Sequence, residues 1–130
     1  ELNILIPGAD YGWPLVSHGE EYSGGSIGIG TSAPGVTDPI AYWTPSIAPS
    51  GMTFYTGDAF SQWRGSLFIG SLVQTHLRRL ELSGNEVTGQ EMLLSGRIGR
   101  IRDVREAPDG TLWLITDERN GALYQMVPAK

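Results

Sequence analysis

Two seven-residue stretches decide the fold: Gly65-Ser66-Leu67-Phe68-Ile69-Gly70-Ser71 and Gly110-Thr111-Leu112-Trp113-Leu114-Ile115-Thr116. Each begins with a glycine and a hydroxyl residue and continues in an apolar run, and the two lie 45 positions apart. Apolar runs of this length between turn residues are typical of buried strands. A period near 45 residues, built of three or four strands, is typical of the blades of a β-propeller. The repeat therefore predicts an all-β fold of about two blades, with a β-sandwich of similar hairpins as the alternative.

Strand-like segments flank both copies of the repeat. Around the first copy we expect strands at 52–55, 76–82 and 86–94, and around the second at 101–105 and 122–127. The second set has no fourth strand. Two blades cannot close a ring, so we expect either a part of a larger propeller or an assembly of several copies, and not a well-folded dilute monomer.

The expected organisation is a single domain, 1–130, in three segments. A strand at 1–6 and a long loop fill residues 1–50, the first blade takes 51–95, and a second, incomplete blade takes 96–130. Glycines, prolines and aromatic residues alternate through the long loop. Because aromatic residues need a surface to pack on, we expect this segment to be ordered, although it is irregular.

Composition excludes several classes of function. The 130 residues contain no cysteine, which excludes a disulfide framework, a cysteine-ligated zinc site and a thiol nucleophile. The formal net charge of -5 argues against a duplex nucleic-acid partner. No apolar run is long enough for a membrane-spanning helix. The chain has no leader-like segment and starts at Glu1, so we expect a processed product or a part of a longer protein.

Four of the nine basic residues lie within nine positions: Arg97, Arg100, Arg102 and Arg105. In a strand, Arg100 and Arg102 project from the same face. Neighbouring guanidinium groups repel unless an anion lies between them, so they predict a site for a carboxylated or phosphorylated ligand. The alternative is a set of solvated or salt-bridged arginines with Asp103 or Glu106 as partners.

The remaining signals are weaker. The turn Tyr11-Gly12-Trp13-Pro14 is interpreted as an aromatic packing element; the Glu1 carboxylate and the Tyr11 carbonyl are oxygen ligands of the kind that Ca²⁺ prefers. His18 and His76 have no second histidine nearby, so we expect structural or surface roles for both. The glycine-rich segment 24–30 follows no clear strand and opens no helix, which excludes a nucleotide-binding loop.

Several blocks together resemble the soluble PQQ-dependent aldose sugar dehydrogenases, the glucose/sorbosone dehydrogenase family, in the same order and nearly without gaps. The blocks are Glu1-Leu2-Asn3, Asp10-Tyr11-Gly12-Trp13-Pro14, 45–52 with Phe54-Tyr55, 67–72, 100–105, Pro108-Asp109-Gly110 and 114–117. The resemblance covers the carboxy-terminal third of a family member, and it implies part of a six-bladed propeller with PQQ and Ca²⁺ as cofactors.

The resemblance also implies site residues. Arg100-Ile101-Arg102 matches a segment that contacts PQQ, a tricarboxylate orthoquinone. Further cofactor contacts are implied at Tyr22, at Ser71-Leu72-Val73 and at Ser46. Family members often have a lysine where this chain has Val73, which carries no charge to pair with the cofactor. Glu1 and Tyr11 match a calcium site, through a carboxylate and a carbonyl.

What the resemblance implies about activity is limited by what this chain lacks. The histidine that takes a proton from the sugar lies in the amino-terminal part of the family, and neither His18 nor His76 matches it. The expected function is therefore one part of an aldose dehydrogenase that oxidises sugars to lactones, inactive alone, in a periplasmic or secreted protein. The sugar substrate, the electron acceptor and the oligomeric state stay open.

Two other classes of function are alternatives to a dehydrogenase. One is a non-catalytic propeller unit, in which about three copies close a homo-oligomeric ring around a central anion site. The other is a sugar-binding module that uses Trp13, Trp43 or Trp63 as stacking platforms, which is disfavoured because packing roles explain these residues.

Overall fold

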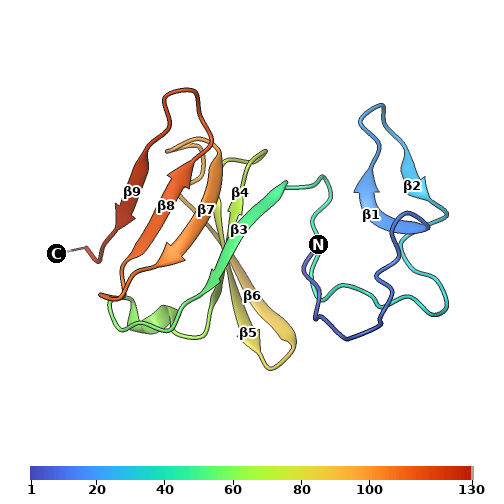
Figure 1. Ribbon diagram of the computed structural model, residues 1–130, viewed down its shortest axis with the longest axis horizontal. Helices are drawn as coiled ribbons and strands as arrows, with labels where there is room; N and C mark the ends of the chain where they lie inside the picture. Colours follow the sequence, from blue (N-terminus) through green and yellow to red (C-terminus); the bar gives the residue numbers. More distant parts are fainter. Residues whose placement is uncertain (130) are drawn as a thin grey trace. The chain divides into compact units, whose positions relative to one another are not determined.

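A computed structural model describes residues 1–129 of the chain (Figure 1). The described part is built of β-strands and one short 3₁₀ turn, η1 (Ser61–Trp63), and it contains no α-helix, so the expected all-β class is confirmed. The chain forms two compact units, Glu1–Ile47 and Ala48–Lys130.

In the first unit a short hairpin is the main regular element. Strands β1 (Val16–Glu20) and β2 (Ser26–Gly28) pair in the antiparallel sense. The turn between them is closed by hydrogen bonds from Glu21 N to Gly25 O and from Gly24 N to Glu21 O, both 2.9 Å. Gly24 and Gly25 have φ values of 86° and 105°, which residues with a side chain rarely adopt.

The strand expected at 1–6 was wrong. Only one isolated bridge forms there, between Leu2 and Ala41. The reason is that the Tyr11 hydroxyl forms hydrogen bonds with the backbone groups that would otherwise pair with a neighbouring strand. It accepts from Ile6 N at 2.6 Å and donates to Ile4 O at 2.7 Å, so a side chain replaces the ladder.

The second unit contains two antiparallel sheets, drawn in green to yellow and in orange to red in Figure 1. In the four-stranded sheet each strand pairs with the next along the chain, in the order β3 (Pro49–Phe54), β4 (Leu67–Ser71), β5 (Leu77–Ser83) and β6 (Glu86–Leu93). The three-stranded sheet has the order β7 (Ile101–Glu106), β8 (Leu112–Thr116) and β9 (Leu123–Met126). The repeated stretches form β4 and β8, the second strand of each sheet.

The main core of the second unit draws residues from both sheets. Every residue of β4 is buried, while β8 alternates Leu112 and Leu114 inward with Trp113 and Ile115 outward. The core cluster consists of eight buried residues: Tyr55, Phe60, Phe68, Leu77, Ile101, Val104, Leu112 and Leu114.

Glycines allow the two sheets to approach closely. A Cβ on Gly70 of β4 would lie 2.9 Å from the carbonyl oxygen of Ile101 of β7, and one on Gly57 would lie 2.8 Å from Gly110 Cα. Side chains do not fit at such distances. The Ser50 hydroxyl adds a hydrogen bond of 2.6 Å to the same Ile101 carbonyl, so the first strand of the second sheet is held against the first sheet.

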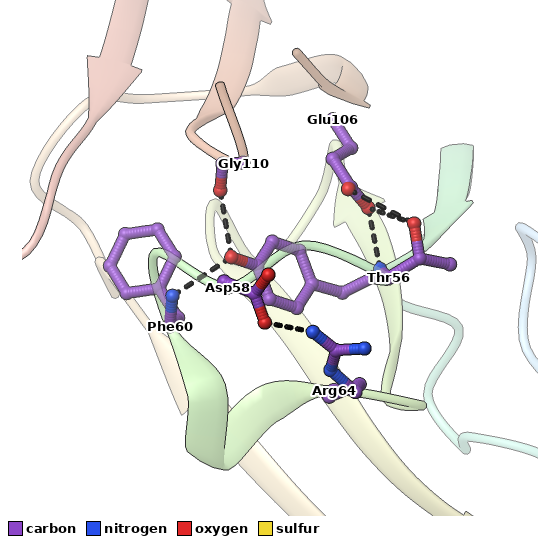
Figure 2. Close-up of polar contacts among 7 residues, drawn as sticks. Thr56, Asp58, Phe60, Arg64, Glu106 and Gly110 are labelled. Atoms are coloured by element: carbon purple, nitrogen blue, oxygen red, sulfur yellow. Dashed lines mark hydrogen bonds and ion pairs between the residues drawn. The ribbon is translucent and has the colours of Figure 1, made fainter. Parts of the chain in front are cut away.

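Tyr55 joins the two sheets at the other end of the core. Its buried hydroxyl donates to Gly110 O and accepts from Phe60 N, each at 2.8 Å. Nearby, Glu106 accepts hydrogen bonds from the Thr56 backbone and hydroxyl (Figure 2). The aromatic ring of Tyr55 packs edge-on against the rings of Phe60 and Phe68.

Replacing Tyr55 by Phe removes the hydroxyl but keeps the ring. The change leaves Gly110 O and Phe60 N buried without their partner, so we expect a loss of about 1–3 kcal/mol in the free energy of unfolding. Urea unfolding of the protein that carries this sequence measures it. Tyr124→Phe, which removes an exposed phenol, is the matched control, and an equal loss in both variants would contradict the assignment.

Candidate functional site

The predicted arginine pair lies where β7 begins. Arg100 is the residue before the strand, and a register shift between Ile101 and Asp103 leaves Arg102 out of the regular pairing with β8. Simple strand alternation therefore does not describe this pair. The Ile101 side chain between them is fully buried in the core.

Both guanidinium groups bind one carboxylate oxygen. Arg100 donates to Asp117 Oδ2 through Nη2 at 2.9 Å and Nε at 3.2 Å, and Arg102 donates through Nη2 at 2.7 Å. These hydrogen bonds, that from Arg100 first, lower the pKa of the Asp117 carboxyl group below its ordinary value. The arginine and aspartate side chains are 36 to 52% exposed, so the group faces solvent.

Asp103 and Glu106, the alternative partners predicted for the pair, bind elsewhere. Asp103 Oδ2 accepts from Arg105 Nε at 3.0 Å, and Glu106 binds Thr56. Asp117 was missed because it follows β8 and comes back beside Arg100 only through strand pairing, where its N–H donates to Arg100 O at 2.8 Å. Glu118 is also close, since its Oε1 accepts from the Arg100 backbone at 2.9 Å.

The predicted segment Ser71-Leu72-Val73 lies at the same end of the two sheets. Gly70, which precedes it, packs against Ile101, so the end of β4 and the start of β7 meet. Ser71 is fully buried, whereas the Val73 side chain is exposed. The structure thus brings two of the predicted cofactor segments together in the second unit.

The turn that carries Leu72 and Val73 is held tightly. Ser71 N donates to His76 O at 3.0 Å, Gln74 N donates to Ser71 Oγ at 3.3 Å, and Gly96 N donates to Thr75 O at 2.9 Å. Thr75 has a φ of 45°, an uncommon conformation for a β-branched residue. A strained residue held by its surroundings fixes where this turn presents its side chains.

His76 supports this turn from the interior. Its side chain is 1% exposed, and Nδ1 lies 3.1 Å from Gln74 O, so Nδ1 carries the proton of the neutral ring. Burial lowers the pKa of His76, and the charge of Arg78 lowers it further. Nε2 is buried and has no hydrogen-bond partner within residues 1–129. The geometry agrees with the expected structural role of this histidine.

In the first unit, three predicted residues line one pocket of about 240 Å³: Glu1, Tyr11 and Ser46. Glu1 Oε1 is 3.5 Å from the backbone nitrogen of His18. The Tyr11 hydroxyl is used on Ile4 and Ile6, which leaves its carbonyl as the group to consider for a metal. Among the described residues no three acidic or histidine side chains cluster as a metal site.

Tyr22, the other predicted cofactor contact in the first unit, follows β1 and is fully exposed. His18 stacks on Tyr42, with ring centroids 3.8 Å apart. Trp13 and Trp43 line the same pocket as Glu1. Trp63 belongs to the second unit, where it stacks on Phe60 at 4.5 Å beside the core.

Comparisons with known proteins agree with one family. The profile of the Glucose / Sorbosone dehydrogenase family matches residues 1–125. The aldose sugar dehydrogenase YliI of Escherichia coli is 43% identical over 130 residues, which cover 98% of this chain and 35% of YliI. The chain thus spans about a third of the length of its curated relatives.

Solved structures extend the comparison. A glucose dehydrogenase crystal structure superimposes with a TM-score of 0.92 at 50% identity, covering 98% of this chain and 37% of that one. The PQQ-bound aldose sugar dehydrogenase of Streptomyces coelicolor gives 0.67 at 28% identity, covering 95% and 34%. These neighbours are β-propeller proteins, so the predicted fold class is confirmed over the sandwich alternative.

The shared carboxylate gives a test of the arginine pair. Because hydrogen bonds from Arg100 and Arg102 lower the pKa of Asp117, we expect its carboxyl group to titrate below the ordinary Asp value of about 3.9. Arg100→Ala and Arg102→Ala should each raise the midpoint toward that value, as measured by carbon-13 NMR titration. Arg97→Ala, an exposed arginine of the same cluster, is the control. An unchanged midpoint in both test variants would refute the shared pairing.

The lowered pKa of Asp117 also determines how this carboxyl group makes the free energy of unfolding depend on pH. The unfolded chain binds the Asp117 proton more tightly than the folded chain does. The contribution of this carboxylate to folding is therefore complete above the unfolded pKa and is lost as the pH falls through the folded pKa.

Proposed function

Because the chain belongs to the glucose/sorbosone dehydrogenase family, we propose that it forms the carboxy-terminal part of a PQQ-dependent aldose dehydrogenase, which oxidises sugars to lactones. In this proposal the chain contributes part of the PQQ site and part of a calcium site. The whole activity, its sugar substrate and its electron acceptor belong to the complete protein, of which relatives are about three times as long.

The convergence of Arg100 and Arg102 on one carboxylate oxygen carries the proposal. Two cations that hold a single carboxylate in solvent-exposed geometry are suited to a ligand with several carboxylates. Arg102 reaches Asp117 through Nη2 alone among the described residues, and its side chain is half exposed, so its remaining N–H donors are accessible to a further acceptor. PQQ is a tricarboxylate, and the donor set fits it.

In this proposal each of the site residues has a defined role. The arginine forks bind and orient carboxylates, and the buried Ser71 and the strained turn after β4 hold the neighbouring wall in place. Val73 presents an apolar side chain, so the wall offers packing there and no charge. When bound, PQQ supplies the quinone that accepts hydride from the sugar. The base that takes the sugar proton lies outside this chain.

Calcium is the second proposed cofactor. Glu1 and Tyr11 line one pocket, where a carboxylate oxygen and a backbone carbonyl would be two ligands of a hard cation. Ca²⁺ takes about six to eight oxygens, so the remaining ligands must be carbonyls, water or groups from the rest of the protein.

We also propose export to the periplasm or the cell exterior, as the resemblance implies. Over residues 1–129 the structure contains no helix that is long and apolar enough to cross a membrane.

The cofactor proposal is tested by titrating PQQ into the protein that carries this sequence and recording its absorbance spectrum. Each charge-assisted hydrogen bond is worth about 1.5–3 kcal/mol, so Arg100→Ala and Arg102→Ala should each weaken binding about ten- to a hundredfold. Arg100→Lys keeps the charge but loses the fork, and should lie between the wild type and Arg100→Ala.

Arg97→Ala is the matched control, since it removes one positive charge from the same cluster without touching Asp117. Equal PQQ affinity in all variants would refute the proposed site. A tight trimer of this chain that ignores PQQ would favour the non-catalytic ring instead.

The calcium proposal predicts that Glu1→Gln weakens Ca²⁺ binding at least about tenfold, because a ligand charge is lost. Isothermal titration calorimetry of the protein after treatment with a chelator measures this. Glu21→Gln, at an exposed acid outside the pocket, should bind as the wild type does. Identical affinity of the wild type and Glu1→Gln would exclude Glu1 as a ligand.

A further inference from the structure

The turn between β8 and β9 contains the one Asn-Gly dipeptide of the sequence, Asn120-Gly121. An asparagine amide carbon is open to attack by the backbone nitrogen of the following residue. Glycine hinders this attack least, because it has no side chain and allows wide backbone freedom. The outcome in a folded protein then depends on whether both groups are available.

The amide carbon is the accessible group in this turn. Asn120 is exposed, and no side-chain hydrogen bond of its amide is recorded within the described residues 1–129. Arg119 and Asn120 form a hydrogen-bonded turn beside the Glu118 carbonyl, so the Gly121 nitrogen attacks only when this exposed turn opens. The flanking residues are held, since Thr116 N donates to Ala122 O at 3.0 Å and Ala122 N donates to Thr116 Oγ1 at 2.8 Å. The strands therefore stay paired on both sides of the turn, and a change in the turn need not separate them.

Asp109-Gly110 gives an internal contrast, because the same ring closure is open to an Asp-Gly pair. Here the structure blocks it. Asp109 Oδ1 accepts from Thr111 N at 2.9 Å and from Thr111 Oγ1 at 2.6 Å, which lowers the pKa of Asp109 and keeps it a poorly electrophilic carboxylate. Gly110 N is committed to Ala107 O at 2.9 Å, and Gly110 O accepts from Tyr55.

The other two asparagines are also less suited to the reaction. Asn3 is followed by Ile4 and Asn85 by Glu86, whose side chains hinder the attacking nitrogen. Asn85 lies in the turn between β5 and β6, so it shares the exposure of Asn120 but not the glycine. It is therefore a natural reference within the same chain.

We propose that Asn120 is a site of spontaneous covalent modification in the folded protein, through a succinimide. The Gly121 nitrogen bonds to Asn120 Cγ, the bond from Cγ to the amide nitrogen breaks, and ammonia leaves with the proton lost from Gly121. Water then opens the ring at either carbonyl, giving aspartate or isoaspartate. The reaction consumes one water, needs no oxidant and adds one negative charge.

The added charge falls beside the arginine pair, and its effect on a ligand rests on the function proposed above for that pair. The turn begins with Asp117 and Glu118, both of which already bind Arg100. Modification therefore adds a third acid to the segment that faces the arginine pair, and isoaspartate also lengthens the backbone of the turn.

The test is to incubate the native full-length protein in mildly alkaline buffer and to map it by mass spectrometry after rapid cleavage at glutamate. Cleavage after Glu86, Glu106 and Glu118 places Asn85, Asp109 and Asn120 on separate peptides. We expect loss of the amide form of the Asn120 peptide with a gain of aspartate and isoaspartate, and an acidic shift of the whole protein by one charge on isoelectric focusing. The Asn85 and Asp109 peptides should stay unchanged.

Two comparisons make the result decisive. Asn120→Gln keeps an amide but must form a larger ring, so it should abolish the acidic shift. The same incubation in urea should add isoaspartate at Asp109, because unfolding releases Gly110 and Thr111. Retention of the Asn120 amide in the native protein, with loss in urea, would overturn the proposal, and so would equal modification of Asn85 and Asn120.

Discussion

The Tyr55 hydroxyl is the contact on which the second unit most depends. It satisfies a carbonyl of the β7–β8 turn and an N–H of the segment before η1, so two loops from different sheets share one buried group. Buried backbone groups are costly when left unpaired, so this single atom stabilises the approach of the two sheets. At the other end of the core, the close contact of Gly70 with Ile101 brings β4 and β7 together.

The two sheets were readable from the sequence because short-range patterns specify them. The copies that became β4 and β8 show apolar runs between turn residues, and each strand pairs with its neighbour along the chain. The first unit was not readable in this way. The Tyr11 hydroxyl takes the backbone groups of Ile4 and Ile6, seven and five residues away, and this replacement of strand pairing by a side chain is not visible in an apolar pattern.

In the candidate site, too, one part could be predicted from the sequence and another could not. The arginine cluster stands out in an acidic sequence, but its partner does not, because Asp117 reaches Arg100 only after β8 has paired with β7. Asp103 and Glu106 were the nearer acids along the chain, and both are used by other residues. The proposal of PQQ as the ligand rests on the resemblance of whole blocks, since paired arginines by themselves fit many anions.

The sharing of Asp117 has a consequence for selectivity. The aspartate acts as a built-in counterion: it keeps two like charges together before any ligand arrives, and an incoming carboxylate must compete with it. A molecule with a single carboxylate merely exchanges one partner for another and gains little. A molecule with several carboxylates would gain contacts that the resident group cannot supply. If the pair binds PQQ as proposed, the resting state itself would therefore disfavour common monocarboxylic metabolites.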